Sequence, residues 1–159
     1  MVARGVANVS SCDRDRVGSI LPTVAEVHAR SVVEGATRTC SFHVDEILRA
    51  RFHQNADVTY QDARENVALS LRLVGGRRLP ALVDLRHVRS QSAEARAYLT
   101  GPEGQRVCSA VALVVGSPVS RVVARFLLHV NRPATPTRSF TCEREAEAWL
   151  HQFAGEESA

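Results

Sequence analysis

Lysine is absent from this chain of 159 residues, so all 20 basic side chains are arginine. A Schiff-base enzyme or a P-loop phosphate site needs a lysine amine, and both are therefore excluded. The net charge of +3 is mild, and we attribute the use of arginine alone to a GC-rich genome. Aromatic residues make up only 5% of the chain. A nucleic-acid surface would interleave more aromatic side chains with its charges, so nucleic acid is not an expected partner.

Metal-binding spacings and long apolar runs are also missing. The four cysteines form no C-x-x-C pair, and the six histidines show neither H-x-x-x-H nor H-E-x-x-H spacing. We therefore predict no metal site and no cofactor. No apolar run approaches the roughly 18 residues of a membrane span. The N-terminal residues are charged and lack an apolar centre, so we expect a cytoplasmic protein with no secretory signal and no membrane partner.

The length fits one domain with a tail. Residues 1–36 lack sustained periodicity, and we interpret them as a poorly ordered tail or as a weak helix around Val24 and Val27. Organised sequence begins near residue 37, so we predict a single domain over residues 37–154 and a frayed end over residues 155–159. A domain of this size buries about two-thirds of its unfolded surface, so its core needs neither a metal nor a disulfide.

Residues 39–43 and 47–53 predict a hairpin, because two strand-like segments flank a three-residue turn. Apolar and basic residues alternate along the second segment, so one face of that strand should be buried and the other solvated. A helix follows. Thr59 and Asp62 have the spacing of a capping box at its start, and Gly75 supplies the positive φ that ends it.

Two apolar segments, residues 81–85 and 110–115, are predicted as strands buried on both faces, because each is short and bounded by turn residues. A serine follows each strand at a predicted helix start. Ser92 begins one helix after a polar loop, and Ser117 begins the other with Pro118 at its first position. In an open α/β sheet, ligands and partners bind beyond the carboxyl ends of such strands, so we place the candidate site there.

The helix after Ser117 carries apolar and basic residues at regular spacing. We expect it to bury its apolar set, Val119, Val122, Val123, Phe126, Leu127 and Val130. Its other side carries Arg121, Arg125 and His129, which is the usual pattern of a solvated helix face. A short edge strand over residues 137–141 and a last helix over residues 143–153 complete the chain.

The predicted order of elements is therefore β-β-α-β-α-β-α-β-α. Strand–helix–strand crossovers are right-handed and produce parallel neighbours, whereas the early hairpin is antiparallel. We predict an α/β fold with a mixed, mostly parallel sheet of about five strands. Helices should cover this sheet, because its two central strands are apolar on both faces.

This order resembles a STAS-type domain, the fold of bacterial anti-sigma-factor antagonists and their SpoIIAA-like relatives of unknown function. The residues that carry the resemblance are LVDLRHV at 82–88, before a serine-bearing helix start, and the ending RSF at 138–140 with EAxxWL at 145–150. The resemblance covers residues 37–153. It implies a STAS-like fold and a regulatory, non-enzymatic role in protein–protein binding.

Antagonists that work by phosphorylation carry an Asp-Ser pair in the loop after the central strand. This chain reads SQSAE at residues 90–94 and lacks the pair, so the switch serine of the family has no direct counterpart. Ser90 and Ser92 lie nearby and are the remaining candidates for phosphorylation. Arg86 and Arg89 would then be the side chains that pair with the phosphate.

Three hypotheses for function remain. The first is a non-catalytic regulatory or scaffolding module that binds an unidentified protein through the loop and helix after the central strand. Its candidate contact residues are Arg86, His87, Arg89, Ser90, Ser92, Arg96, Ser117 and Arg121. The alternative is a small-anion or small-ligand binding protein that uses the helix N-termini at Ser92 and Ser117.

The third hypothesis is an enzyme that uses Asp84 and His87 as an acid–base pair. We do not expect catalysis, because no nucleophile accompanies the pair and the GSP turn at residues 116–118 is not the G-x-S-x-G of a nucleophile elbow. Self-association into a homodimer also stays open, because a sheet with a short edge strand can pair with a second copy.

Overall fold

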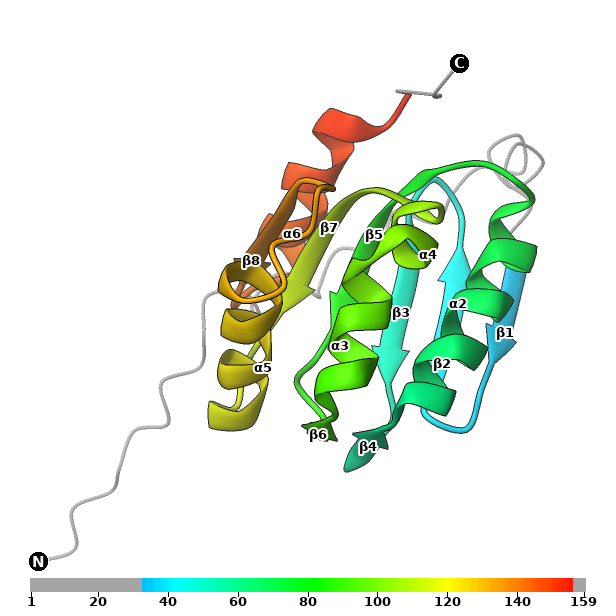
Figure 1. The fold of residues 1–159 in the computed structure, drawn as a ribbon. Helices are drawn as coiled ribbons and strands as arrows, with labels where there is room; N and C mark the ends of the chain where they lie inside the picture. Colours follow the sequence, from blue (N-terminus) through cyan, green and yellow to red (C-terminus); the bar gives the residue numbers. More distant parts are fainter. Residues whose placement is uncertain (1–32, 156–159) are drawn as a thin grey trace, which may run out of the picture. The chain divides into compact units, whose positions relative to one another are not determined.

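A six-stranded sheet forms the centre of the computed structural model, which describes residues 33–155 (Figure 1). Its strands, in spatial order, are β1 (Val33–Ala36), β2 (Cys40–Val44), β3 (Leu48–Phe52), β5 (Leu79–Asp84), β7 (Cys108–Val114) and β8 (Thr137–Phe140). β1, β2 and β3 pair antiparallel, whereas β3, β5, β7 and β8 pair parallel. The predicted fold class, an α/β fold with a mixed and mostly parallel sheet, is confirmed.

Helices cover both faces of this sheet, although unequally. The helices are α2 (Tyr60–Val74), α3 (Ala93–Thr100), α4 (Pro102–Gln105), α5 (Pro118–His129) and α6 (Glu143–Leu150), followed by a 3₁₀ turn at His151–Phe153. The helices α2 to α5 lie on one face, and α6 lies on the other face against β5, β7 and β8 (Figure 1). The carboxyl end of β5 therefore lies between two helical layers.

Three strands of the structure, β1, β4 (Ala56–Val58) and β6 (Val88–Gln91), are absent from the sequence prediction. β1 lies inside the segment predicted as a tail, so the sheet begins ahead of the predicted domain boundary at residue 37. Its four residues are exposed or half-buried, and this edge strand lacks the alternation that marks a strand in sequence. The helix predicted around Val24 and Val27 lies outside the described residues.

The second difference is in the polar loop predicted before Ser92. Its last four residues form β6 (Val88–Gln91), which pairs in parallel with β4 (Ala56–Val58) as a separate two-stranded sheet. Val88 and Gln91 are buried, whereas Arg89 and Ser90 are exposed. Because this segment is mostly polar, its sequence predicts a loop, although the residues at its two ends are buried.

The helix caps match the prediction. Thr59 and Asp62 make both bonds of a capping box at the start of α2, and Gly75 ends that helix at φ 61°. The Ser92 hydroxyl accepts a hydrogen bond from the Ala95 N–H at 3.1 Å at the start of α3. Ser117 accepts one from the Ser120 N–H at 3.0 Å at the start of α5. These local signals therefore position both helices that begin beyond the central strands.

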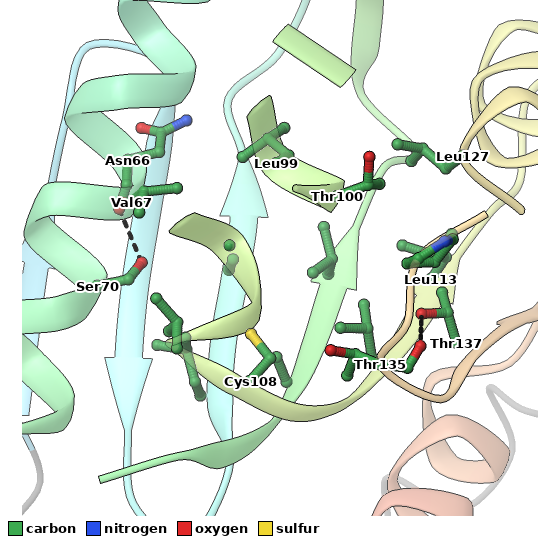
Figure 2. Close-up of a pocket in the computed structure, with 18 of the residues that line it drawn as sticks. Asn66, Val67, Ser70, Leu99, Thr100, Cys108, Leu113, Leu127, Thr135 and Thr137 are labelled. Carbon is green, nitrogen blue, oxygen red and sulfur yellow. Dashed lines mark hydrogen bonds between the residues drawn. The ribbon is translucent and has the colours of Figure 1, made fainter. Parts of the chain in front are cut away.

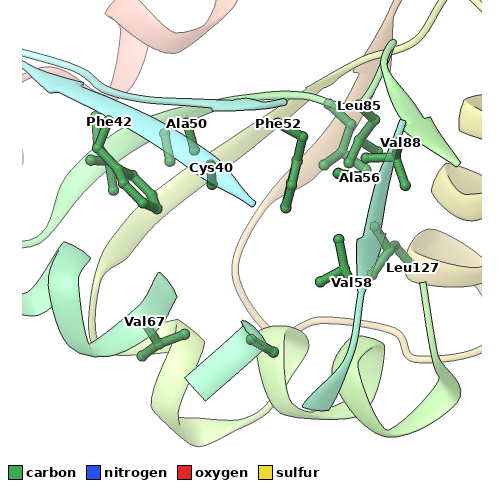
Figure 3. Packing of buried hydrophobic residues seen from close by; sticks show 14 of the residues in the cluster. Cys40, Phe42, Ala50, Phe52, Ala56, Val58, Val67, Leu85, Val88 and Leu127 are labelled. Carbon is green, nitrogen blue, oxygen red and sulfur yellow. The ribbon is translucent and has the colours of Figure 1, made fainter. Parts of the chain in front are cut away.

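The core has two parts, one on each face of the sheet. The larger part lies between the sheet and helices α2 to α5 (Figure 2 and Figure 3). In Figure 3, Phe42 and Phe52 point from the strands toward the layer that carries Val67. The smaller part lies against α6 and includes Leu82 and Leu150. The prediction that the central strands are buried on both faces is confirmed.

The orientation predicted for α5 is wrong for four of its six apolar residues. Val119, Val122, Phe126 and Val130 are 42%, 53%, 42% and 67% exposed. The helix buries Val123 and Leu127 as predicted, and it also buries Ser120 and Ala124, which were not predicted as core. Small residues at two of these buried positions allow the helix to approach its neighbours closely. A continuous apolar edge is consequently left in solvent.

Candidate functional site

The carboxylate of Asp84 ends β5 and is 1% exposed. It accepts hydrogen bonds from the Arg86 backbone N–H at 3.0 Å, from Nε at 2.9 Å and from Nη2 at 2.7 Å. Arg51 on β3 adds a longer bond at 3.3 Å. Glu143 at the start of α6 accepts from both arginines, at 2.9 Å from Arg51 and 3.1 Å from Arg86. The rim of the sheet thus carries a closed network of two acids and two arginines.

This network sets the charge states at the rim. Burial by itself would raise the pKa of Asp84, but the hydrogen bonds from Arg86 and the positive charges of Arg86 and Arg51 lower it overall. The same hydrogen bonds raise the pKa of Arg86. Asp84 is therefore an ionised carboxylate held by arginine. His87 is exposed, and arginines occupy the carboxylate that it would need as an acid–base partner.

Arg89 and Ser90 form a second cluster with Asp57 of β4. Arg89 donates to both carboxylate oxygens of Asp57, and the Ser90 hydroxyl donates at 2.6 Å. These bonds lower the pKa of Asp57 to about 2. A phosphate on Ser90 would lie against this carboxylate, and like charges repel at such a distance. The charges of Arg89 and Asp57 therefore neutralise each other within this cluster.

Both serine-capped helix starts satisfy their own backbone groups. The Ser117 hydroxyl donates to Ser120 Oγ at 3.0 Å while it caps α5, and Ser120 Oγ also accepts from the Gly116 N–H at 3.0 Å. Gly116 lies under Arg86, because a Cβ built on Gly116 would be 3.2 Å from Arg86 Cγ. The structure therefore brings the strand-end loop of β5 and the start of α5 together.

Arg96 is the candidate residue that links α3 to the apolar edge of α5. Its guanidinium carbon lies 4.8 Å from the centroid of the Phe126 ring, and its Nη1 donates to the Gln91 carbonyl at 2.7 Å. A cation over an aromatic face is attracted by the ring quadrupole and fixes the ring in place. Arg96 thus helps to hold the Phe126 ring in its place on the apolar edge of α5.

A basic edge runs beside the apolar edge. Arg121, Arg125 and His129 are exposed on α5, and Arg132 follows in the next turn. Among the residues that the structure describes, Arg121 and Arg125 have no carboxylate partner. The sequence from Pro118 to Arg132 contains no acidic residue. We call the exposed Val119, Val122, Phe126 and Val130 the apolar edge, and the adjoining arginines the basic edge.

The eight predicted site residues therefore do not form one site. Arg86 belongs to the acidic–basic network at the rim, Arg89 and Ser90 belong to the Asp57 cluster, and Ser92 and Ser117 cap helices. His87 is exposed. Arg96 and Arg121 lie on the surface formed by α3 and α5.

Sequence reasoning missed the apolar edge of α5. One signal could have revealed it: Ser120 is the third residue of a helix capped by Ser117, where a short polar side chain turns back to the cap and is buried. Counting Ser120 and Ala124 as core positions rotates the helix and leaves Val122 and Phe126 outside.

Comparison with known proteins gives a family and a similar structure. The family model that matches residues 41–154 is described as a domain of unknown function, DUF7793. Among solved structures, this chain is similar to an uncharacterized protein from the DUF3478 family with a SpoIIAA-like fold, from Shewanella loihica PV-4. The two chains share 16% identity with a TM-score of 0.48, and the match covers 76% of this chain and 93% of that one. No curated protein matches.

Two kinds of feature are absent from the described residues. No helix between residues 33 and 155 is long and apolar enough to cross a membrane. In the same part of the chain, no three side chains of the types histidine, cysteine, aspartate and glutamate are grouped so that they could hold a metal ion.

Proposed function

The chain belongs to the DUF7793 family, and we propose that it is a non-catalytic module that binds an acidic, amphipathic helix of a partner protein across α5. The observation that carries this proposal is the apolar edge of α5, whose residues are 42% to 67% exposed although α5 begins with a complete capping box. Exposed apolar patches on soluble domains mark interaction surfaces when polar residues surround them.

The geometry suits a helix as the bound element. The apolar edge follows the α5 axis at positions 119, 122, 126 and 130, which is the spacing of one stripe on a helix. A second amphipathic helix can bury such a stripe by laying its own apolar stripe alongside it. Phe126, fixed by Arg96, is the aromatic anchor that such an interface needs near its centre.

Charge complementarity indicates which helices would bind. The basic edge places Arg121 and Arg125 beside the apolar edge, with no acid on the same helix to neutralise them. A partner helix with carboxylates next to its apolar stripe would pair with these arginines, whereas a basic helix would be repelled. Such pairs lie at the rim of the interface, so they set the choice of partner more than the affinity.

The alternative, an anion site at the helix starts, has less support. Arg86 and Arg89 already hold carboxylates of this chain, and the hydroxyls of Ser92 and Ser117 already bind backbone N–H groups. An anion would have to displace these partners. Arg121 and Arg125, which have no carboxylate partner among the described residues, lie on the α5 surface instead.

The proposal is tested with a photo-crosslinking residue at position 122 of the full chain, expressed in its native cells. We expect crosslinks to one partner protein, within a helix that carries an apolar stripe and carboxylates, and we expect its retention on immobilised chain to fall with added salt. Crosslinks at a matched surface position, Ala68 on α2, should not reach that helix.

The matched pair of variants is Val122→Glu and Ala68→Glu, which place the same charge on exposed positions of two helices. Val122→Glu should abolish capture of the partner, and Ala68→Glu should leave it unchanged. Crosslinking only to a second copy of this chain, to a helix without carboxylates, or to nothing at all would contradict the proposal.

A further inference from the structure

An apolar cavity of about 130 Å³ lies between the sheet and the helices α2 to α5 (Figure 2). Its sheet side includes Ala50 and Ala81, and its helix side includes Val67, Leu99 and Leu127. Native cores hold few voids larger than a water molecule. A cavity of this size is therefore unusual for a native core, and we consider whether it binds a ligand.

Gln91 distinguishes this cavity from a packing defect. It lines the cavity from the end of β6 and is 8% exposed. Both atoms of its side-chain amide, Oε1 and Nε2, are buried without a hydrogen-bond partner. Buried polar atoms are almost always paired, because an unpaired amide loses its bonds to water without replacement. A buried amide with both a free donor and a free acceptor points to a missing polar partner.

Several other polar groups around the cavity already have hydrogen-bond partners within the chain. The Ser70 hydroxyl donates to the Asn66 carbonyl at 2.8 Å, and Thr100 donates to the Arg96 carbonyl at 2.8 Å. Figure 2 shows the first of these bonds and the one from Thr137 to the Thr135 carbonyl, at 2.8 Å. Gln91 is therefore the lining side chain best suited to recognise a polar group, because both of its amide atoms are buried and unpaired.

We propose that this cavity binds a small, neutral, mainly apolar molecule whose single polar group both donates and accepts a hydrogen bond with Gln91. Neutrality follows from the lining, which contains no charged side chain. A charged ligand would lose its hydration with no counter-charge in return. The two lining thiols are also neutral, since burial raises the pKa of Cys40 and raises that of Cys108 to about 12.

The volume limits the ligand to about the size of one substituted ring. An engineered apolar cavity of about 150 Å³ stays dry and binds benzene. The present cavity is similar in size and differs by its one unpaired amide. Phenol fits these limits, because its ring is apolar and its hydroxyl is both a donor and an acceptor. Toluene has the same shape without the hydroxyl, and benzoate adds a charge.

The experiment titrates the full chain with phenol, toluene and benzoate, followed by calorimetry and by amide shifts of residues around the cavity. We expect saturable binding of phenol, about five- to 100-fold weaker binding of toluene because both hydrogen bonds to Gln91 are lost, and no binding of benzoate. Gln91→Met, which keeps the length of the side chain, should abolish the preference for phenol. The same change at the exposed Gln61 should not alter it.

A cavity-filling variant supplies the second control. Ala50→Leu places three carbons into the cavity and should abolish binding of both phenol and toluene, and Ala81→Leu serves if the first variant does not fold. Absence of saturable phenol binding at millimolar concentrations, or binding that persists in both cavity-filling variants, would overturn the proposal. A crystal structure in which a water molecule is hydrogen-bonded to Gln91 and no probe displaces it would also overturn it.

This test is independent of the proposed partner binding. Val122→Glu should leave phenol binding intact, because Val122 lies on the exposed side of α5.

Discussion

The Arg86 guanidinium donates two parallel hydrogen bonds to the Asp84 carboxylate, at 2.9 Å from Nε and 2.7 Å from Nη2. The carboxylate is 1% exposed, whereas the arginine is 37% exposed. The pair therefore ends the central strand with a buried acid whose cation still reaches solvent. It holds the turn after β5 and keeps Arg86 over Gly116 at the start of α5.

Asp84→Asn should destabilise the domain. The amide cannot accept both guanidinium bonds as an ionised carboxylate does, and it brings an N–H₂ group close to Arg86. Because the arginine can turn toward water, we expect a loss of about 1–3 kcal/mol in the free energy of unfolding. Urea denaturation at neutral pH measures it.

The control for this variant is Asp57→Asn, which removes the acid of the exposed cluster with Arg89 and Ser90. Exposed ion pairs contribute less than about 1 kcal/mol, so this variant should stay close to the native chain. Equal effects of the two substitutions would show that burial of Asp84 does not determine the strength of its ion pair.

Acid should weaken the fold in part through Asp84. Its pKa is lowered in the folded state, with burial opposing and the Arg86 bonds favouring the ionised form. The unfolded chain then binds the proton more readily, so the stabilisation is present above a pH of about 4 and is lost as pH falls through the folded pKa. Urea denaturation of the native chain from neutral pH to about pH 3 should show this fall.

Asp84→Asn should flatten the same pH profile, because it removes the titrating group. Asp62, whose pKa is also lowered by bonds from Thr59 and Arg38 against the effect of burial, stays in the variant and retains part of the slope. A variant profile as steep as the native one would assign the acid sensitivity to groups other than Asp84.

Ser117 should behave as a helix cap and not as an anion ligand. Ser117→Ala removes the acceptor for the Ser120 N–H and should cost about 1 kcal/mol, whereas Ser117→Gly should cost only about a few tenths. Inorganic phosphate at millimolar concentrations should not raise the melting temperature of the native chain. A saturable rise that Ser117→Ala abolishes would instead support an anion site at this helix start.

Local signals in the sequence predicted the parts of this fold that depend on neighbouring residues. The caps at Thr59, Ser92 and Ser117 and the stop at Gly75 are determined within a few positions, and all four are found where they were predicted. The hairpin of β2 and β3 is local as well. Pairing of Asp84 with Arg86, two residues apart, was also within reach of the sequence.

Longer-range features were missed because their causes lie elsewhere in the chain. β6 forms because its ends, Val88 and Gln91, pair with β4, which lies about thirty residues earlier in the chain. The residues next to β6 in the sequence contain no signal of this pairing. Likewise, the apolar edge of α5 was taken as core, since an apolar stripe predicts burial only when the face that meets the sheet is known. The cavity beside Gln91 depends on the fit of many elements and has no local signal.

The orientation of α5 can be tested by two adjacent valines. Val122 is 53% exposed and Val123 is 5% exposed, so their side chains point to solvent and to the core. Val123→Ala should lower the free energy of unfolding by about 2 kcal/mol, because it removes buried carbon and leaves a void. Val122→Ala should change it by about 0.5 kcal/mol or less, since a solvated side chain makes few contacts to lose. Both values come from urea denaturation of otherwise identical chains. A larger loss at Val122 than at Val123 would mean that α5 buries the stripe assigned here to partner binding, and the proposed surface would then be part of the core.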